Sequence, residues 1–266
     1  MSTSAASAPS SADSVDPCAD PTTPGARFLR KHGFLRIRLL AADVLRLEVL
    51  FRVDHLSQDL LNEIFSDPEL CAFPPGKSSR VIRFLDTDSR VEELRAIVLR
   101  SFEAALGSSP GSLHFAAKTA YQLASRPKVT RMLVHRDHPL AFTDLRISFN
   151  INVSPVPRLL HLFPGSHRSP HGDVSVESLP VSVETGQWEV LAWNTSLFHA
   201  GPSNVSAMWQ IALHGTVSNL VDPGSGSWGD DWRYMLLLSD ADKVFNKTKQ
   251  LVCRPLAVDE LFILQL

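Results

Sequence analysis

The sequence predicts a mainly β protein, either a sandwich, a barrel or a jelly roll, with helices flanking it. From about residue 113 onward, the chain consists of short and often β-branched segments separated by Pro, Gly and Asn. In the preceding eighty residues, apolar side chains recur at helical spacing. The chain has 266 residues, which is long enough for one domain with a substantial core.

The composition excludes several classes of protein. With 44% hydrophobic and 20% charged residues, the chain as a whole can bury a core and is not intrinsically disordered. A net charge of −2 argues against a nucleic-acid partner, and no apolar run approaches the roughly 20 residues that span a bilayer. The three cysteines are far apart and lack CxxC spacing, which favours a reducing compartment. We therefore expect a soluble, cytoplasmic protein of open oligomeric state, with no membrane and no nucleic acid as partner.

The chain divides into a tail and one domain. Residues 1–26 are rich in Ser, Ala and Pro and lack a bulky apolar cluster, which predicts a disordered tail rather than a secretory signal. Residues 27–266 are expected to form a single domain. Within it, 27–107 is predicted as a mostly helical buttress, 113–217 as the β core and 218–266 as an extension that packs on the core.

Two helices and six strand regions are distinct enough to be placed. Residues 55–65 and 89–106 show helical periodicity, and Gly107 is expected to end the second helix. Strands are expected within 113–123, 129–137, 145–155, 158–166, 187–194 and 209–217.

Three polar residues predict a transition-metal site. His135 and Asp137 are two residues apart, so in a strand they project to the same side. His199 follows the strand segment WEVLAW and precedes a turn, where it offers a third ligand. Two histidines and a carboxylate on one face of a metal are typical of non-haem iron(II) oxygenases, which keep other positions open. We predict that these residues bind the metal and carry catalysis.

Three motifs make this interpretation more specific. The motifs are HRDHP (135–139), LFPGSHR (162–168) and GQWEVLAWNTSLFHAGPSNVS (186–206). Their residues and their order along the chain resemble those of the phytanoyl-CoA hydroxylase-like branch of the iron(II)/2-oxoglutarate dioxygenases. The resemblance covers about residues 28–217. It implies a cupin-like, double-stranded β-helix (jelly-roll) core, iron(II) held by the predicted triad, 2-oxoglutarate as co-substrate and a small-molecule substrate. Hydroxylation, desaturation and cyclisation are all compatible with such a site.

Two strands carry polar faces that we interpret as walls of one pocket. Residues 145–155 alternate between apolar side chains and the polar set Arg146, Ser148, Asn150 and Asn152. Residues 209–217 place Gln210, Ala212, His214 and Thr216 on one face. The residues predicted to contact substrate are Lys118, Gln122, Asn152, Trp209 and His214.

The sequence departs from this family at one position. The family usually has an arginine shortly after the second histidine ligand to bind the far carboxylate of 2-oxoglutarate, whereas this chain has Met208 and Gln210 there. One explanation is that Arg146 or Arg131 supplies the charge, with Ser148, Asn150 and Gln210 completing the co-substrate site. The alternatives are a non-haem iron oxidase or oxygenase that needs no 2-oxoglutarate, and a non-catalytic, cupin-like ligand-binding module.

Overall fold

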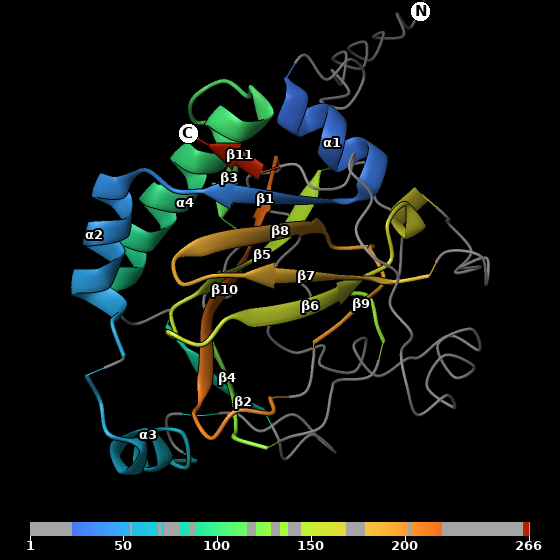
Figure 1. Ribbon diagram of the computed structural model, residues 1–266. Coiled ribbons are helices and arrows are strands. Elements are labelled where there is room, and N and C mark those ends of the chain that lie inside the picture. Colours follow the sequence, from blue (N-terminus) through green and yellow to red (C-terminus); the bar gives the residue numbers. More distant parts are fainter. Residues whose placement is uncertain are drawn as a thin grey trace, which may run out of the picture.

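The computed structural model describes residues 23–53, 55–68, 71, 80–85, 89–115, 121–128, 134–137, 145–168, 179–201, 204–219 and 263–265. These residues form two β-sheets that lie one in front of the other, with helices outside (Figure 1). The larger sheet has the order β11 (Ile263–Gln265), β1 (Phe34–Arg38), β8 (Glu189–Asn194), β5 (Arg146–Asn152), β10 (Gln210–Ser218), β4 (Tyr121–Ser125) and β2 (Arg80–Phe84), and β3 (His114–Phe115) also pairs with β10. The smaller sheet has the order β7 (Val181–Thr185), β6 (Arg158–Leu162) and β9 (His199–Ala200). The predicted mainly β architecture with flanking helices is confirmed.

The first helix begins slightly earlier than the sequence suggested. Helix α1 (Pro24–His32) has proline in its first turn, and the side-chain oxygen of Thr23 accepts a hydrogen bond from the amide of Ala26. Gly33 ends the helix with a φ of 83° and donates its amide to the carbonyl of Leu29. Residues 24–26, which we had assigned to the tail, therefore belong to α1, because the N-terminal cap precedes them.

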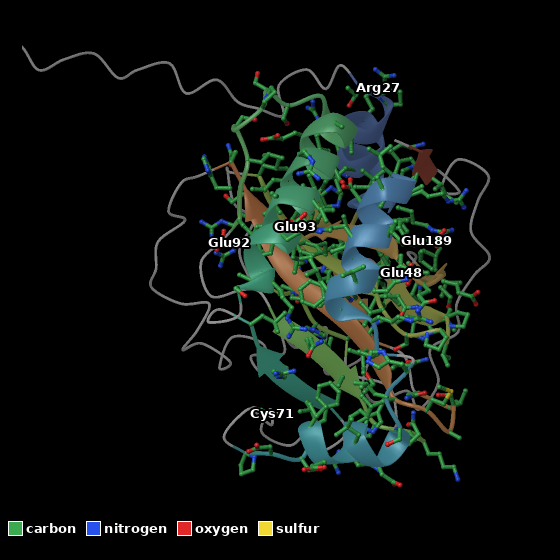
Figure 2. All side chains as sticks on the ribbon, turned by 90° about the vertical axis from the view of Figure 1, so that its left-hand side faces the viewer. Arg27, Glu48, Cys71, Glu92, Glu93 and Glu189 are labelled. Atoms are coloured by element: carbon green, nitrogen blue, oxygen red, sulfur yellow. The ribbon has the colours of Figure 1, made fainter. Side chains whose placement is uncertain are left out.

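Two helices cover the outer face of the larger sheet. Helices α2 (Ala41–Phe51) and α4 (Arg90–Leu106) lie next to one another over that face, as Figure 2 shows. The face of α4 that the sequence predicted is buried, and Phe102 packs on Phe149 of β5 with their ring centroids 5.9 Å apart. Gly107 ends α4 with a φ of 69°, as expected. No helix among the described residues is long and apolar enough to cross a membrane.

Five of the described strands were not foreseen in the predicted elements: β1, β2, β7, β9 and β11. Strands β1 and β2 fall inside the segment that we expected to be mostly helical, although α3 (Gln58–Ile64) matches one of the predicted helices. Strand β7 completes the smaller sheet. Strands β1 and β2 form because neighbouring strands of the larger sheet, β8 and β4, offer them backbone partners, which short-range periodicity does not reveal.

Strand β5 is the centre of the molecule. All seven of its residues are buried, since helices cover one of its faces and the smaller sheet covers the other. It pairs with β8 on one side and with β10 on the other. Side chains of these three strands that point toward the smaller sheet therefore enclose an interior shared by the two sheets, which we call the barrel interior.

We expect Gly215→Val to destabilise the fold by about 1–3 kcal/mol, because it overpacks the core. A Cβ atom at Gly215 would overlap the ring of Phe115 and lie 2.9 Å from the ring of Phe149. Gly186→Val is the matched control, since the nearest atom to its Cβ, a carboxylate oxygen of Glu189, is 3.6 Å away. Urea denaturation would compare the two variants, and equal stabilities would contradict the packing argument.

Candidate metal centre

Backbone pairing brings the two predicted histidine ligands together. His135 and His199 form an antiparallel bridge in which each amide donates to the other's carbonyl at 2.9 Å. In such a pair the two side chains project from the same face, and here the imidazole centroids are 4.4 Å apart. Two residues separated by more than sixty positions in the sequence are thus direct neighbours.

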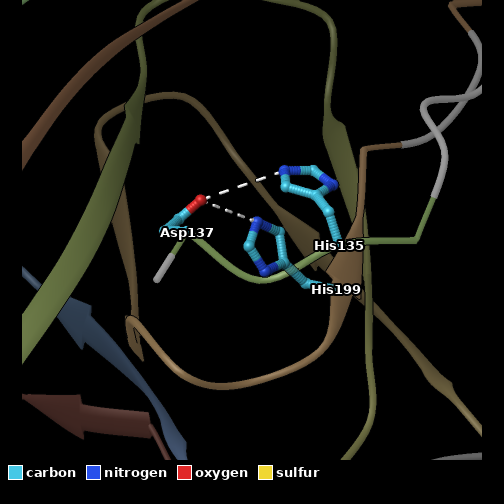
Figure 3. A group of neighbouring side chains, drawn as sticks. All are labelled: His135, Asp137 and His199. Atoms are coloured by element: carbon cyan, nitrogen blue, oxygen red, sulfur yellow. Dashed lines mark ion pairs between the residues drawn. The ribbon is translucent and has the colours of Figure 1, made fainter. Parts of the chain in front are cut away.

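Asp137 completes the predicted triad. It lies two residues beyond His135, and its Oδ1 atom is 3.3 Å from Nε2 of His199 and 3.9 Å from Nε2 of His135 (Figure 3). The three potential ligand atoms lie within 4.8 Å of one another. All three side chains are at least nine-tenths buried, so a cation bound there would be shielded from bulk water.

Hydrogen bonds fix which atoms of the triad face the common centre. Nδ1 of His199 is 3.0 Å from the carbonyl of Leu197, which can only accept, so Nδ1 carries a proton and Nε2 is the nitrogen that faces Asp137. The indole Nε1–H of Trp193 donates to Oδ2 of Asp137 at 2.8 Å, which leaves Oδ1 toward the histidines. Bonds of this kind orient metal ligands in proteins.

The electrostatics of Asp137 favour a ligand carboxylate. Burial by itself would raise the pKa of Asp137, but the neighbouring imidazoles, His199 first and His135 next, hold that pKa far below its ordinary value. The group is therefore ionised at neutral pH. An anionic oxygen with two neutral imidazole nitrogens is a donor set that suits a divalent transition metal.

The PGSH motif supports the strand that carries His199. Gly165, at a φ of 81°, donates its amide to the carbonyl of His32. The hydroxyl of the buried Ser166 accepts a hydrogen bond from the amide of Phe198, which immediately precedes the ligand. The motif thus acts on the metal centre through the backbone, by holding the position of β9.

The turn after His199 is held by Asn204. Its side-chain amide donates to the carbonyls of Ser125, Arg126 and Met208, and its Oδ1 accepts from the amide and hydroxyl of Ser206. This agrees with the turn-forming role that asparagine plays in such segments. The turn directs the chain from β9 into β10.

The polar faces of β5 and β10 share the barrel interior, as predicted. Oδ1 of Asn150 is 2.8 Å from Nδ1 of His214, and the ring of His214 lies beside that of Trp193 with centroids 5.8 Å apart. Burial is the main cause that lowers the pKa of His214 to about 4, although the charge of Asp137 opposes it. Ser148, opposite Trp193 in the sheet, has a buried hydroxyl without a hydrogen-bond partner among the described residues. The interior therefore offers polar groups around the triad.

Two residues predicted to contact substrate lie elsewhere. The indole of Trp209 donates to Oδ1 of Asn62 on α3 at 2.9 Å and packs against Phe65. Gln122 is paired with Leu213 and so shares the helix-facing side of the larger sheet. The strand register turns both side chains away from the barrel interior, where we expected the substrate to lie.

Asn152, which we predicted to contact substrate, makes hydrogen bonds within the protein. Its amide donates to the carbonyls of Val156 and Thr185, and its Oδ1 accepts from the amide of Ser154. These bonds hold the turn from β5 to β6 and tie it to β7, so its hydrogen-bonding groups are already used within the protein. Lys118 and Arg131 lie outside the described residues.

The residues predicted to bind the co-substrate lie at different ends of the barrel interior. Arg146 and Ser148 lie at the beginning of β5, where Ser218 of β10 is the partner of Arg146. Gln210 lies at the opposite end, beyond the pairing of Ala212 with Asn152, and donates to the carbonyl of Pro157 at 3.2 Å. Arg146 and Gln210 therefore cannot hold the same carboxylate, contrary to the grouping that the sequence suggested.

Sequence reasoning missed two residues of the interior. Trp193 is not among the predicted site residues, although the N–H of a buried indole usually has an acceptor, and here that acceptor is the ligand Asp137. Arg158 was overlooked, although it shares the buried side of β6 with Leu160 and Leu162. A charged residue at an otherwise apolar period-two position is the signal that would have identified it.

The comparisons with known proteins identify the fold. No protein-family model and no curated protein matches this sequence. Among solved structures, AviO1 from Streptomyces viridochromogenes Tue57 superposes with a TM-score of 0.56 at 17% identity, over 74% of this chain and 95% of that one. The epimerase SnoN in complex with Fe3+, alpha ketoglutarate and nogalamycin RO gives 0.52 at 15%, over 76% and 90%. EvdO2 from Micromonospora carbonacea var. aurantiaca, complexed with 2-oxoglutarate, gives 0.52 at 13%, over 79% and 94%. At these identities the likeness establishes the jelly-roll fold.

We expect wild-type protein to bind one iron(II), and His135→Ala, Asp137→Ala and His199→Ala each to abolish tight binding, because two remaining donors hold the ion poorly. Anaerobic titration followed by metal analysis after gel filtration measures the stoichiometry. His161→Ala is the control, since its Nδ1 contacts Ser182 on the smaller sheet. Retained stoichiometry in all three variants would place the metal site elsewhere.

We expect Trp193→Phe to weaken iron(II) binding about 10- to 100-fold, because Oδ2 of Asp137 loses the donor that orients it. Trp188→Phe is the matched control: Trp188 is also buried and precedes the same strand, and its Nε1 has no hydrogen-bond partner among the described residues. Dissociation constants from anaerobic calorimetry test this. Equal losses in the two variants would show that packing, not the hydrogen bond, matters.

Proposed function

We propose that this protein is a non-haem iron(II), 2-oxoglutarate-dependent oxygenase that oxidises a small molecule. The observation that carries the proposal is the buried convergence of His135, Asp137 and His199 in the interior of a jelly roll. We also propose that it belongs to the phytanoyl-CoA hydroxylase-like branch, on the strength of its PGSH and HxGxxNxS motifs.

The residues of the site fit an iron(II) ion. Nε2 of each histidine and Oδ1 of Asp137 lie close together, and the hydrogen bonds of Leu197 and Trp193 engage the other polar atoms of His199 and Asp137. Three ligands from one side leave positions for a co-substrate and oxygen. With 2-oxoglutarate, iron(II) supplies an oxidant strong enough for an unactivated C–H bond.

The protein's own residues orient the substrate and exclude water from the site. Leu160 and Leu162 form an apolar wall opposite β5, and Leu162 is fully buried beside His199 in the smaller sheet. Ser148, Asn150 and His214 supply polar groups on the other wall. An interior of this kind holds a reactive centre away from bulk water and leaves substrate orientation to a few hydrogen bonds.

The substrate we propose is a small organic molecule. SnoN, which has a similar fold, is an epimerase crystallised with nogalamycin RO, and SnoK, at a TM-score of 0.51 and 20% identity, is a carbocyclase. We therefore propose oxidation at a carbon centre as the common step and leave hydroxylation, desaturation and cyclisation as alternative outcomes. Neither nucleic acid nor a membrane is proposed as a partner, and we propose a cytoplasmic location.

The rival function is an iron oxidase that draws all its electrons from its substrate. It is favoured by Gln210, which occupies the region where the related family has its carboxylate-binding arginine. The two functions differ in co-substrate consumption, since only the first converts 2-oxoglutarate to succinate.

We expect iron(II)-loaded protein to release succinate and carbon dioxide from 2-oxoglutarate in air, slowly without substrate and faster with it. Mass spectrometry of succinate from labelled 2-oxoglutarate measures this, and Asp137→Ala is the control because it removes the only anionic ligand of the triad. Oxidised product without succinate, from protein stripped of bound ligands, would favour the rival function.

A further inference from the structure

A 2-oxoglutarate molecule bound at the triad has an unmet electrostatic requirement. The iron ion brings two positive charges, Asp137 brings one negative charge and the co-substrate brings two. The complex therefore carries one excess negative charge inside the barrel interior, and a buried charge without a counter-charge is strongly unfavourable. Some cation must face the far carboxylate.

Arg158 is a buried arginine on β6, the strand that pairs with β9. In the ladder between β6 and β9, Leu162 pairs with His199, whose side chain faces the barrel interior. Arg158 lies four residues before Leu162 and so on the same face, about 13 Å along the strand. Its side chain is only 3% exposed. The extended side chain of Arg158 and the five-carbon 2-oxoglutarate are together long enough to span the distance between the Arg158 backbone and the metal site.

Gln210 lies at the same end of the barrel interior. Its amide nitrogen donates to the carbonyl of Pro157, the residue immediately before Arg158. The position on β10 that would carry the family's arginine is thus adjacent to the beginning of β6. An arginine on the smaller sheet and one on the larger sheet would approach the same volume from opposite walls.

Arg158 and His214 both face the barrel interior. The charge of Arg158 contributes to the low pKa of His214, for which burial is the largest cause. His214 in turn lies beside Trp193 and is within range of Asp137. Arg146, in contrast, begins β5 at the end remote from Gln210, six residues before Asn152. That offset amounts to about 20 Å along the strand.

We propose that Arg158, on β6, binds the far carboxylate of 2-oxoglutarate in place of the missing arginine on β10, and that Gln210 holds the chain beside it. The inference rests on the proposed function, because it presupposes that 2-oxoglutarate occupies the triad. Guanidinium and carboxylate match each other in a two-pronged hydrogen bond, which makes the site selective for a 2-oxo diacid over a 2-oxo monoacid.

Paired titrations with 2-oxoglutarate and pyruvate isolate this contact, since pyruvate has the same metal-binding end but lacks the far carboxylate. Each full-length protein is loaded with iron(II) without oxygen, and binding is followed by the charge-transfer absorption and by calorimetry. We expect Arg158→Gln to weaken 2-oxoglutarate about 10- to 100-fold and to leave pyruvate within about twofold of wild type. Arg146→Gln, the matched control, should change neither affinity.

Each other outcome has a distinct meaning. If the wild type binds no 2-oxoglutarate, the proposed function fails and this inference fails with it. If the wild type binds it and Arg158→Gln binds it equally well, only the assignment of Arg158 is overturned. A selective loss in Arg146→Gln alone would transfer the role to that residue.

Two further variants test the inference, and Arg158→Lys does so even if Arg158→Gln does not fold, as judged by circular dichroism. Arg158→Lys preserves the charge but not the fork, so it should weaken 2-oxoglutarate about tenfold with pyruvate unchanged. The double variant Arg158→Gln with Gln210→Arg moves the cation to the opposite wall and should recover most of the 2-oxoglutarate affinity. Unchanged binding in Arg158→Lys together with no recovery in the double variant would reject the assignment.

Discussion

The metal centre depends on one backbone contact, the pair of hydrogen bonds between His135 and His199. This bridge places the two imidazoles side by side and brings Asp137 to the same face two residues later. Because the main chain makes this pairing, the relative positions of the two histidines do not depend on contacts between their side chains. The jelly roll is what makes it possible, since it returns β9 beside the segment that carries His135.

Many of the conspicuous motif residues serve this bridge rather than the chemistry. The hydroxyl of Ser166 accepts a hydrogen bond from the amide of the residue before His199. The side-chain amide of Asn204 donates to three backbone carbonyls and so stabilises the turn that follows. Trp193 is different, because its indole bonds directly to the ligand Asp137. Most motif residues in this protein therefore hold the ligand residues in position and are not ligands themselves. This explains why the motifs are longer than the triad.

The barrel interior contains a buried carboxylate and a buried guanidinium, and burying either charge alone would be unfavourable. Asp137 stays ionised because two imidazoles face it, and Arg158 is almost fully buried on a strand side otherwise occupied by leucines. With iron(II) bound, the end that holds Asp137 carries a net positive charge, and Arg158 supplies a second positive charge at the other end. The interior then complements a molecule with a carboxylate at each end. In this respect the electrostatics of the site and its proposed co-substrate are consistent.

The sequence by itself determined the mainly β class, helix α4 with its glycine terminator, the polar faces of β5 and β10, and the three members of the triad. These features follow from local periodicity and from the chemistry of single residues, which a linear pattern contains. Tertiary structure alone decided which side of the larger sheet Trp209 and Gln122 face, that Asn152 ties a turn, and that Arg158 rather than Arg146 shares an end of the interior with Gln210. Those properties depend on strand register, and a strand's register is fixed by partners that lie far away in the sequence.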